Sequence, residues 1–216
     1  VDGNGQQELE HLIVGMLKQK NCKIELLDKD ISQDSIIQRK MQGLAYIPSD
    51  RLKYAIMEDQ SIAFNYLLGN QQRDEFNKKG LIDYKKLNAY SSEAVEKYDV
   101  RTAGIEENVG GLSGGNQQKM VLSRELSQNP KLIIAGQPTR GLDIGAIEFV
   151  HTALLKERDN GNAVVLISAE LSEITELSDR ILVLCNGEVM AEDYKEAFTR
   201  ESLGLLMAGK RKEEKQ

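Results

Sequence analysis

Residues 112–119 read Leu-Ser-Gly-Gly-Asn-Gln-Gln-Lys, a glycine turn that opens a helical pattern whose apolar positions continue to Leu126. A serine at the helix cap, two glycines that an anion can approach closely, and the positive end of the helix together form a receptor for a terminal phosphate. A well-capped helix would explain Ser113, but it would not explain the two glycines and the polar run that follows them. We therefore predict an anion-binding helix N-terminus at this turn.

A second glycine turn precedes an amphipathic helical pattern over residues 6–20. Residues 1–7 read Val-Asp-Gly-Asn-Gly-Gln-Gln, which degenerately matches the phosphate-loop pattern G-x-x-x-x-G-K-[ST]. Gln6 stands where the pattern has lysine, and Gln7 where it has the hydroxyl that holds magnesium. The predicted phosphate cradle comprises Gly3, Asn4, Gly5, Gln6 and Gln7. A plain turn before a helix is the alternative interpretation.

Four short aliphatic runs have the length of buried strands: residues 44–47, 132–135, 163–167 and 181–184. Helical patterns separate the last three, so we predict an α/β fold with a mostly parallel sheet flanked by helices. Asn186-Gly187 predicts a hairpin that adds an antiparallel edge to this sheet. The polar residues 53–110 have helical patterning and indicate a helical insertion with a mobile segment near 69–92.

The composition limits the possible classes of protein. The chain has 216 residues, of which 40% are hydrophobic and 29% charged, which indicates one globular unit. No apolar run approaches the roughly 18 residues of a membrane-spanning helix. The net charge of -6 argues against a general nucleic-acid binder. Cys22 and Cys185 match no metal-ligand spacing, so no metal site of the chain's own is predicted. Because the chain begins with valine, we expect a piece cut from a longer protein.

The order and spacing of three segments carry a family resemblance. These are the glycine loop, the segment Leu-Ser-Gly-Gly-Asn-Gln about a hundred residues later, and a strand followed by Gln-Pro-Thr-Arg-Gly-Leu-Asp at 137–143. In these three segments the chain closely resembles an ATP-binding-cassette ATPase. Together with Ala-Tyr-Ile-Pro-Ser-Asp-Arg at 45–51, the chain resembles the second cassette of a tandem importer ATPase for simple sugars and nucleosides. Residues 144–151 and 199–209 favour the nucleoside branch.

The resemblance implies a P-loop NTPase-like fold that lacks the family's N-terminal strands, including the strand that leads into the phosphate loop. The implied organisation is a first part of the nucleotide-binding core at 1–52 and a helical subdomain at 53–111. The signature helix, the strand before Gln137 and the rest of the core follow at 112–209. Residues 210–216 form a charged tail.

Five positions depart from the family's pattern. Gln6 replaces the loop lysine, Gly136 the magnesium-holding aspartate, and Gln137 the glutamate that polarises water. Ala169 replaces the switch histidine, and Ser49 replaces the glutamine that links nucleotide and transporter. We therefore expect that this chain's own pocket does not hydrolyse ATP and that the isolated chain is inactive.

In the family, two cassettes meet head to tail, and each gives its signature turn to the ATP held by the other. The resemblance thus assigns Ser113, Gly114 and Gly115 to the γ-phosphate of the partner's ATP, where charge develops during transfer. Leu112, Asn116 and Gln117 complete the turn, and Asp143 faces the partner.

The cofactor implied is ATP, with magnesium supplied at the partner's site. The expected partners are the N-terminal cassette of the same polypeptide, the membrane permease subunits and, indirectly, a periplasmic or lipoprotein substrate-binding protein. The expected location is the cytoplasmic face of the cell membrane. Residues 46–51 and 53–68 are similar to the part of a cassette that receives the permease, although a solvated helix is an equal alternative.

Two other functions remain as alternatives. A cassette ATPase without a permease, acting on ribosomes or DNA ends, is disfavoured by the acidic balance of the chain. A regulatory module that binds nucleotide without helping hydrolysis is disfavoured by the intact signature turn. His11 and His151 lie on helical patterns, and we expect neither to have an acidic partner.

Overall fold

The structure of the protein is a computed structural model that describes residues 3–210. Its centre is a parallel sheet of β3 (Leu44–Ile47), β6 (Leu132–Gly136) and β7 (Ala163–Ile167), in the order β3-β6-β7. These bounds confirm the first three predicted strands. Because the strands are parallel, their carboxyl ends lie at one edge, where α/β proteins build their sites.

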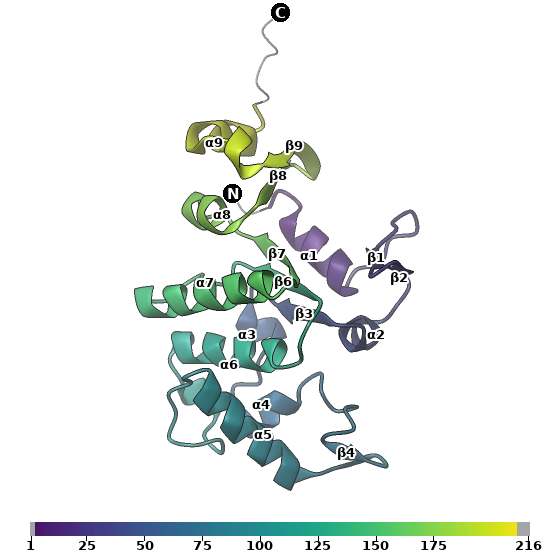
Figure 1. Cartoon of the computed structure of the whole chain (residues 1–216), viewed down its shortest axis with the longest axis vertical. Coiled ribbons are helices and arrows are strands. Elements are labelled where there is room, and N and C mark those ends of the chain that lie inside the picture. Colours follow the sequence, from purple (N-terminus) through teal and green to yellow (C-terminus); the bar gives the residue numbers. More distant parts are fainter. Residues whose placement is uncertain (1–2, 211–216) are drawn as a thin grey trace, which may run out of the picture.

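Helices cover both faces of this sheet (Figure 1). On one face, α6 (Gly114–Leu126) packs on β3 and α7 (Ile144–Asp159) on β7. On the other, α1 (Gln6–Val14) packs on β6 and α2 (Ile36–Met41) on β3. Successive strand residues alternate between the two hydrophobic clusters: Ile133 and Ala135 belong to one, and Ile134 to the other. The predicted α/β class is confirmed.

Residues 51–111 form the segment drawn below the sheet in Figure 1. It contains α3 (Arg51–Tyr54), α4 (Ile62–Leu67), α5 (Tyr84–Lys97) and a 3-10 turn at Val109–Gly111. The predicted helical character is confirmed, except that β4 (Asn77–Lys78) and β5 (Leu81–Ile82) form a short antiparallel pair. Lys79 and Gly80 turn the chain with φ of 55° and 87°. The segment shares one hydrophobic cluster with α6.

The C-terminal part corrects one prediction. Residues 181–184 do lie in a strand, β8 (Arg180–Cys185), but its partner among the described residues is β9 (Glu188–Tyr194) and not the central sheet. The hairpin turn at Asn186-Gly187 is confirmed, with φ of 51° and 78°. β8 alternates exposed with buried residues at its start, as expected of a strand with one buried face.

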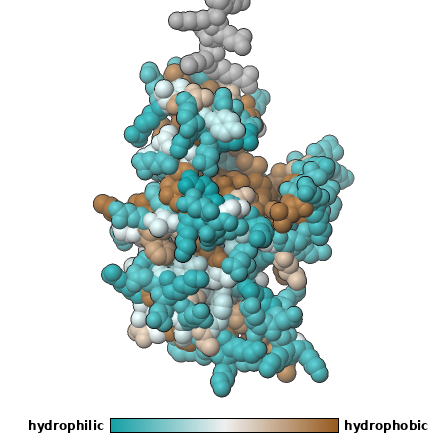
Figure 2. Space-filling model, in the orientation of Figure 1, coloured by the Kyte–Doolittle hydropathy of each residue, from teal (hydrophilic) through white to brown (hydrophobic). Residues whose placement is uncertain are grey.

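An apolar cavity of about 640 Å³ separates β7 from β8. Figure 2 shows the hydrophobic band at this level. Leu9 of α1, Val165 of β7 and Val183 of β8 line it, with residues of α8 (Leu171–Leu177) and α9 (Arg200–Met207). The remaining elements are β1 (Glu25–Leu26), β2 (Lys29–Asp30) and a 3-10 turn at Lys195–Ala197.

Among the helices of residues 3–210, none combines the length and the apolar character that a bilayer crossing requires. The predicted tail lies outside the described residues except for Lys210.

Candidate functional site

The signature turn caps α6 as predicted. Ser113 is the N-cap residue, with φ −61° and ψ 154°, and its Oγ accepts hydrogen bonds from the backbone N of Asn116 at 3.4 Å and from its Nδ2 at 3.0 Å. Asn116 Oδ1 in turn accepts from the backbone N of Arg101 at 2.9 Å. Ser113 is exposed. The turn therefore presents the Ser113 hydroxyl to solvent at the N-terminus of a 13-residue helix.

The two glycines of the turn permit close approach by neighbouring segments. A Cβ on Gly114 would lie 2.7 Å from Nη2 of Arg51, and a Cβ on Gly115 would lie 3.0 Å from Cβ of Ala146. Asp143, which is exposed, caps α7 by accepting from the backbone N of Ala146 at 2.9 Å. The N-termini of α6 and α7 thus form one surface with an arginine beside it.

Two predicted binding residues of the turn lie inside the protein. Leu112 is buried and belongs to the main hydrophobic cluster. Gln117 is buried, donates from Nε2 to the carbonyl of Val109 at 3.2 Å, and accepts at Oε1 from Nε of Arg51 at 3.4 Å. Their side chains hold the turn in place, and Arg51 connects it to the loop after β3.

The glycine loop that precedes α1 is described from Gly3 onward. Gly3 and Gly5 have φ of 90° and 100°, and α1 begins at Gln6. The side chain of Gln6 folds back over the loop, where its Oε1 accepts from the backbone N of Asn4 at 3.0 Å. Gln7 is exposed. The loop is thus a turn with two left-handed glycines, and the amide of Gln6 bonds to the loop's own backbone.

The tip of the β8–β9 hairpin docks on this loop. Asn4 is buried, and its Oδ1 accepts from the backbone N of Asn186 at 3.0 Å. Its carbonyl accepts from the backbone N of Gly187, also at 3.0 Å. Asn4, predicted to bind phosphate, thus joins the loop to a segment distant in sequence.

Glu10, a buried residue of α1 that the sequence analysis missed, contacts the end of β3 and the loop after it. Its side chain is 1% exposed, and Oε1 accepts from the hydroxyl of Tyr46 at 2.5 Å and from the backbone N of Ser49 at 3.3 Å. Burial, followed by the hydrogen bond to Glu10, raises the pKa of Tyr46 above its ordinary value. The one feature of the sequence that could have indicated a buried Glu10 is its position one helical turn before Val14, which is buried.

The end of β6 carries the other altered positions. Gln137 has φ 41°, donates its backbone N–H to the carbonyl of Ile167 at 2.7 Å, and accepts at Oε1 from the backbone N of Ala169 at 3.4 Å. A left-handed conformation is unusual for a residue with a side chain. Residues 137 and 169 are thus in contact. Their side chains are an amide and a methyl group, where the family's pattern has a carboxylate and an imidazole.

The pocket does not fit magnesium. A nucleotide-bound magnesium ion takes one or two carboxylates together with the phosphates. Gly136 offers no side chain, and Glu10 accepts hydrogen bonds from two neighbours. Across residues 3–210, no group of three or more His, Cys, Asp or Glu side chains is placed to hold a metal.

One histidine prediction is wrong. His151 Nε2 lies 3.0 Å from Oε1 of the buried Glu173, which also accepts from the hydroxyl of Thr139 at 2.9 Å. Glu173 belongs to α8 and reaches His151 of α7 from another element, which periodicity within one helix could not indicate. His11 packs edge-on against Tyr54, with ring centroids 5.4 Å apart.

Comparison with known proteins agrees with this geometry. A family model described as ABC transporter matches residues 2–140. Nucleoside import ATP-binding protein NupA of Lactococcus lactis subsp. cremoris (strain MG1363) is 41% identical over 97% of this chain and 41% of its own length. Guanosine import ATP-binding protein NupO of Bacillus subtilis (strain 168) is 42% identical over 99% and 42%. Glucose import ATP-binding protein TsgD13 of Haloferax volcanii is 40% identical over 97% and 38%.

Solved structures share the fold. The ATP-binding cassette MJ1267 of an ABC transporter superposes with a TM-score of 0.77 at 21% identity, covering 96% of this chain and 83% of that one. The cassette MJ0796 bound to ADP and Pi gives 0.74 at 21% identity, covering 92% and 84%. The chain spans about two fifths of the length of the curated relatives it matches. By its sequence and its fold, this chain belongs to the ABC transporter family.

Proposed function

We propose that this chain is the second cassette of a tandem import ATPase, in which its signature turn completes the ATP site of the N-terminal cassette of the same polypeptide. One observation carries the proposal: the signature turn is exposed and its serine hydroxyl is held by Asn116, in a chain whose own hydrolytic side chains are replaced. The relatives NupA and NupO are more than twice as long as the matched segment, which leaves room for a second cassette in each.

At the signature surface, this chain's residues would bind the γ-phosphate of the partner's ATP, which supplies the phosphoanhydride bond. Ser113 would donate its hydroxyl, and the amides of Gly114 and Gly115 would donate from the helix end. Asn116 holds the serine hydroxyl in position through its Nδ2. Asp143 lies beside the turn and faces the same surface. Magnesium would be held by the partner.

Closure of the two cassettes would reach the permease through the loop after β3 and α3. Arg51 contacts the signature helix through Gln117, so movement of the turn would be passed to this segment. Two large apolar side chains near it, Leu52 and Met57, are 49% and 44% exposed, which suits a protein contact. The chain would therefore work at the cytoplasmic face of the membrane. The names of NupA and NupO favour a nucleoside over a simple sugar as solute.

The test is Ser113→Arg in the full-length protein, with ATP hydrolysis as the readout. We expect a loss of about 100-fold, the scale of removing one donor from a developing oxyanion. Ser35→Arg is the matched control, because Ser35 is also an exposed N-cap serine and lies on α2. Binding of ATP to the partner cassette should persist in both variants. Unchanged turnover in Ser113→Arg would refute the proposal and favour a regulatory module.

A further inference from the structure

The carboxylate of Glu10 connects three segments at the end of the central sheet. Glu10 comes from the second turn of α1, Tyr46 from β3, and Ser49 from the loop that follows β3. Besides the bonds from Tyr46 and from the backbone of Ser49, Oε1 accepts from Oγ of Ser49 at 3.5 Å. Burying a carboxylate is costly unless it is hydrogen-bonded. These donors therefore stabilise Glu10 inside the pocket.

The same carboxylate fills the space that a side chain at position 136 would need. A Cβ built on Gly136 would lie 2.4 Å from Oε2, 2.8 Å from Cδ and 3.0 Å from Oε1 of Glu10. All three nearest atoms belong to one group. Such distances are far below normal contact, so residue 136 can gain a side chain only if the carboxylate of Glu10 moves from this position.

We propose that Glu10 and Gly136 are a mutually exclusive pair, and that Glu10 is the latch that closes this chain's own pocket. Glu10 takes the place of the strand-end side chain and joins α1 to β3 and to the loop after it. An aspartate introduced at position 136 would place a second carboxylate beside that of Glu10 in the same buried volume. Steric overlap and the repulsion of like charges would both disfavour this arrangement. The pocket would then be kept from hydrolysing ATP by the packing of Glu10 as well as by the replaced side chains.

This inference deepens the proposed function and rests on it for the identity of the pocket, but the exclusion of one side chain by the other stands on the geometry alone. The test is a double-substitution cycle in the whole protein, with backbone hydrogen exchange of the peptide covering α1 as a local readout. Its result does not depend on ATP hydrolysis, so failure of the latch and failure of the signature role are distinguishable.

In this cycle we expect Gly136→Asp alone to speed exchange in α1 by about tenfold or more, because Glu10 must leave its donors. In the Glu10→Ala background the same substitution should change exchange by less than about threefold. Gly204→Asp is the matched control, since no atom lies within 4 Å of a Cβ at this exposed helical glycine, and it should leave α1 unchanged. If Gly136→Asp fails to fold, Gly136→Ala tests the same overlap with one carbon. Equal effects of the substitution in both backgrounds would overturn the proposal.

Discussion

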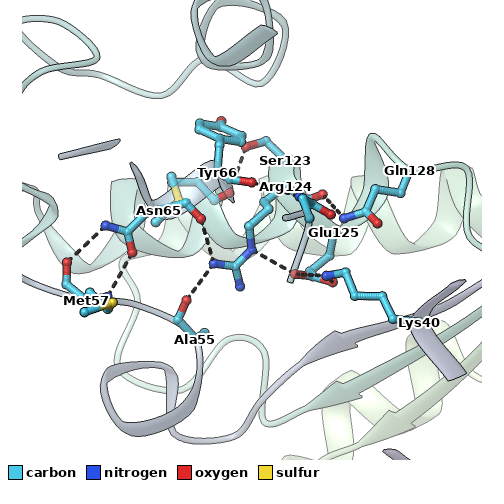
Figure 3. A network of polar contacts seen from close by, with 11 residues as sticks. Lys40, Ala55, Met57, Asn65, Tyr66, Ser123, Arg124, Glu125 and Gln128 are labelled. Atoms are coloured by element: carbon cyan, nitrogen blue, oxygen red, sulfur yellow. Dashed lines mark hydrogen bonds and ion pairs between the residues drawn. The ribbon is translucent and has the colours of Figure 1, made fainter. Parts of the chain in front are cut away.

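Replacing Glu125 by glutamine is expected to destabilise the protein strongly, because it removes the counter-charge of one buried cation, Arg124, and of the partly buried Lys40. Glu125 Oε1 accepts from Nε of Arg124 at 2.8 Å, and its Oε2 lies 2.8 Å from Nζ of Lys40 (Figure 3). The three side chains are 4%, 5% and 16% exposed. Arg124 also donates from Nη1 to the carbonyls of Ala55 at 2.7 Å and Asn65 at 3.2 Å. This network therefore joins α6 to α2 and to the helical segment.

The magnitude follows from the burial of the network. Removing one partner of a buried ion pair costs about 3–5 kcal/mol, mostly because a charge is left uncompensated. Arg124 keeps its two carbonyl partners in the variant, which places the cost near the lower end, at about 3 kcal/mol. For a chain of this size, each kcal/mol shifts the midpoint of thermal unfolding by about 2–4 °C, so we expect a decrease of about 6–12 °C.

The assay is thermal unfolding followed by circular dichroism, with Glu25→Gln as the control. Glu25 forms an ion pair of similar length with Lys23, at 2.9 Å, but the two side chains are 49% and 67% exposed. Exposed pairs contribute little, so this control should shift the midpoint by less than about 2 °C. Equal shifts in Glu125→Gln and Glu25→Gln would refute the argument, because burial is what separates the two pairs.

Three further predictions concern the same elements. Burial raises the pKa of Glu125, but the charges of its two cationic partners outweigh this, so its pKa lies below the ordinary value. The ionised Glu125 therefore stabilises the fold above the unfolded pKa of about 4.3, and this stabilisation is lost as pH falls below that value. The thermal unfolding midpoint of Glu125→Gln should depend less on pH in this range than that of the unmodified protein. Asn4→Ala should speed hydrogen exchange at Asn186, measured by mass spectrometry, because the backbone N–H of Asn186 loses the side-chain oxygen that accepts from it. Asp143→Ala should destabilise α7 by about 1 kcal/mol in chemical denaturation, whereas Asp143→Asn should keep the cap.

The three strands of the central sheet could be predicted from the sequence because each reads as a short run of mostly aliphatic residues, and β3 and β6 are buried along most of their length. The cap of α6 could be predicted because its chemistry is local: Ser113 and Asn116 are three residues apart. The assignment of β8 to the sheet failed because its run, Ile-Leu-Val-Leu, looks equally buried although Leu182 is 45% exposed. The pattern of apolar residues along the sequence does not indicate which sheet a strand joins.

The contacts of Glu10 and Glu173 could not be predicted, because each depends on a residue brought close only by the fold. An acidic side chain on an amphipathic helix is normally assigned to the solvent face. Glu10 is inside because Gly136 leaves room for it, and Glu173 is inside because α7 and Thr139 supply donors. Neither condition can be read from the helix that carries the glutamate.

The glycine loop before α1 makes structural contacts that do not depend on a bound nucleotide. Gly5 has φ 100°, and a Cβ there would lie 3.1 Å from the Cα of Gly187, so the glycine is required by the docked hairpin as well as by the turn. Asn4 holds the same hairpin through its side chain and its carbonyl. One turn later, Glu10 binds β3 and the loop that follows it. The loop and its helix thus hold together the sheet, the loop after β3 and the C-terminal hairpin, and substitutions that disrupt it would damage the scaffold of the signature turn without any nucleotide being bound to it.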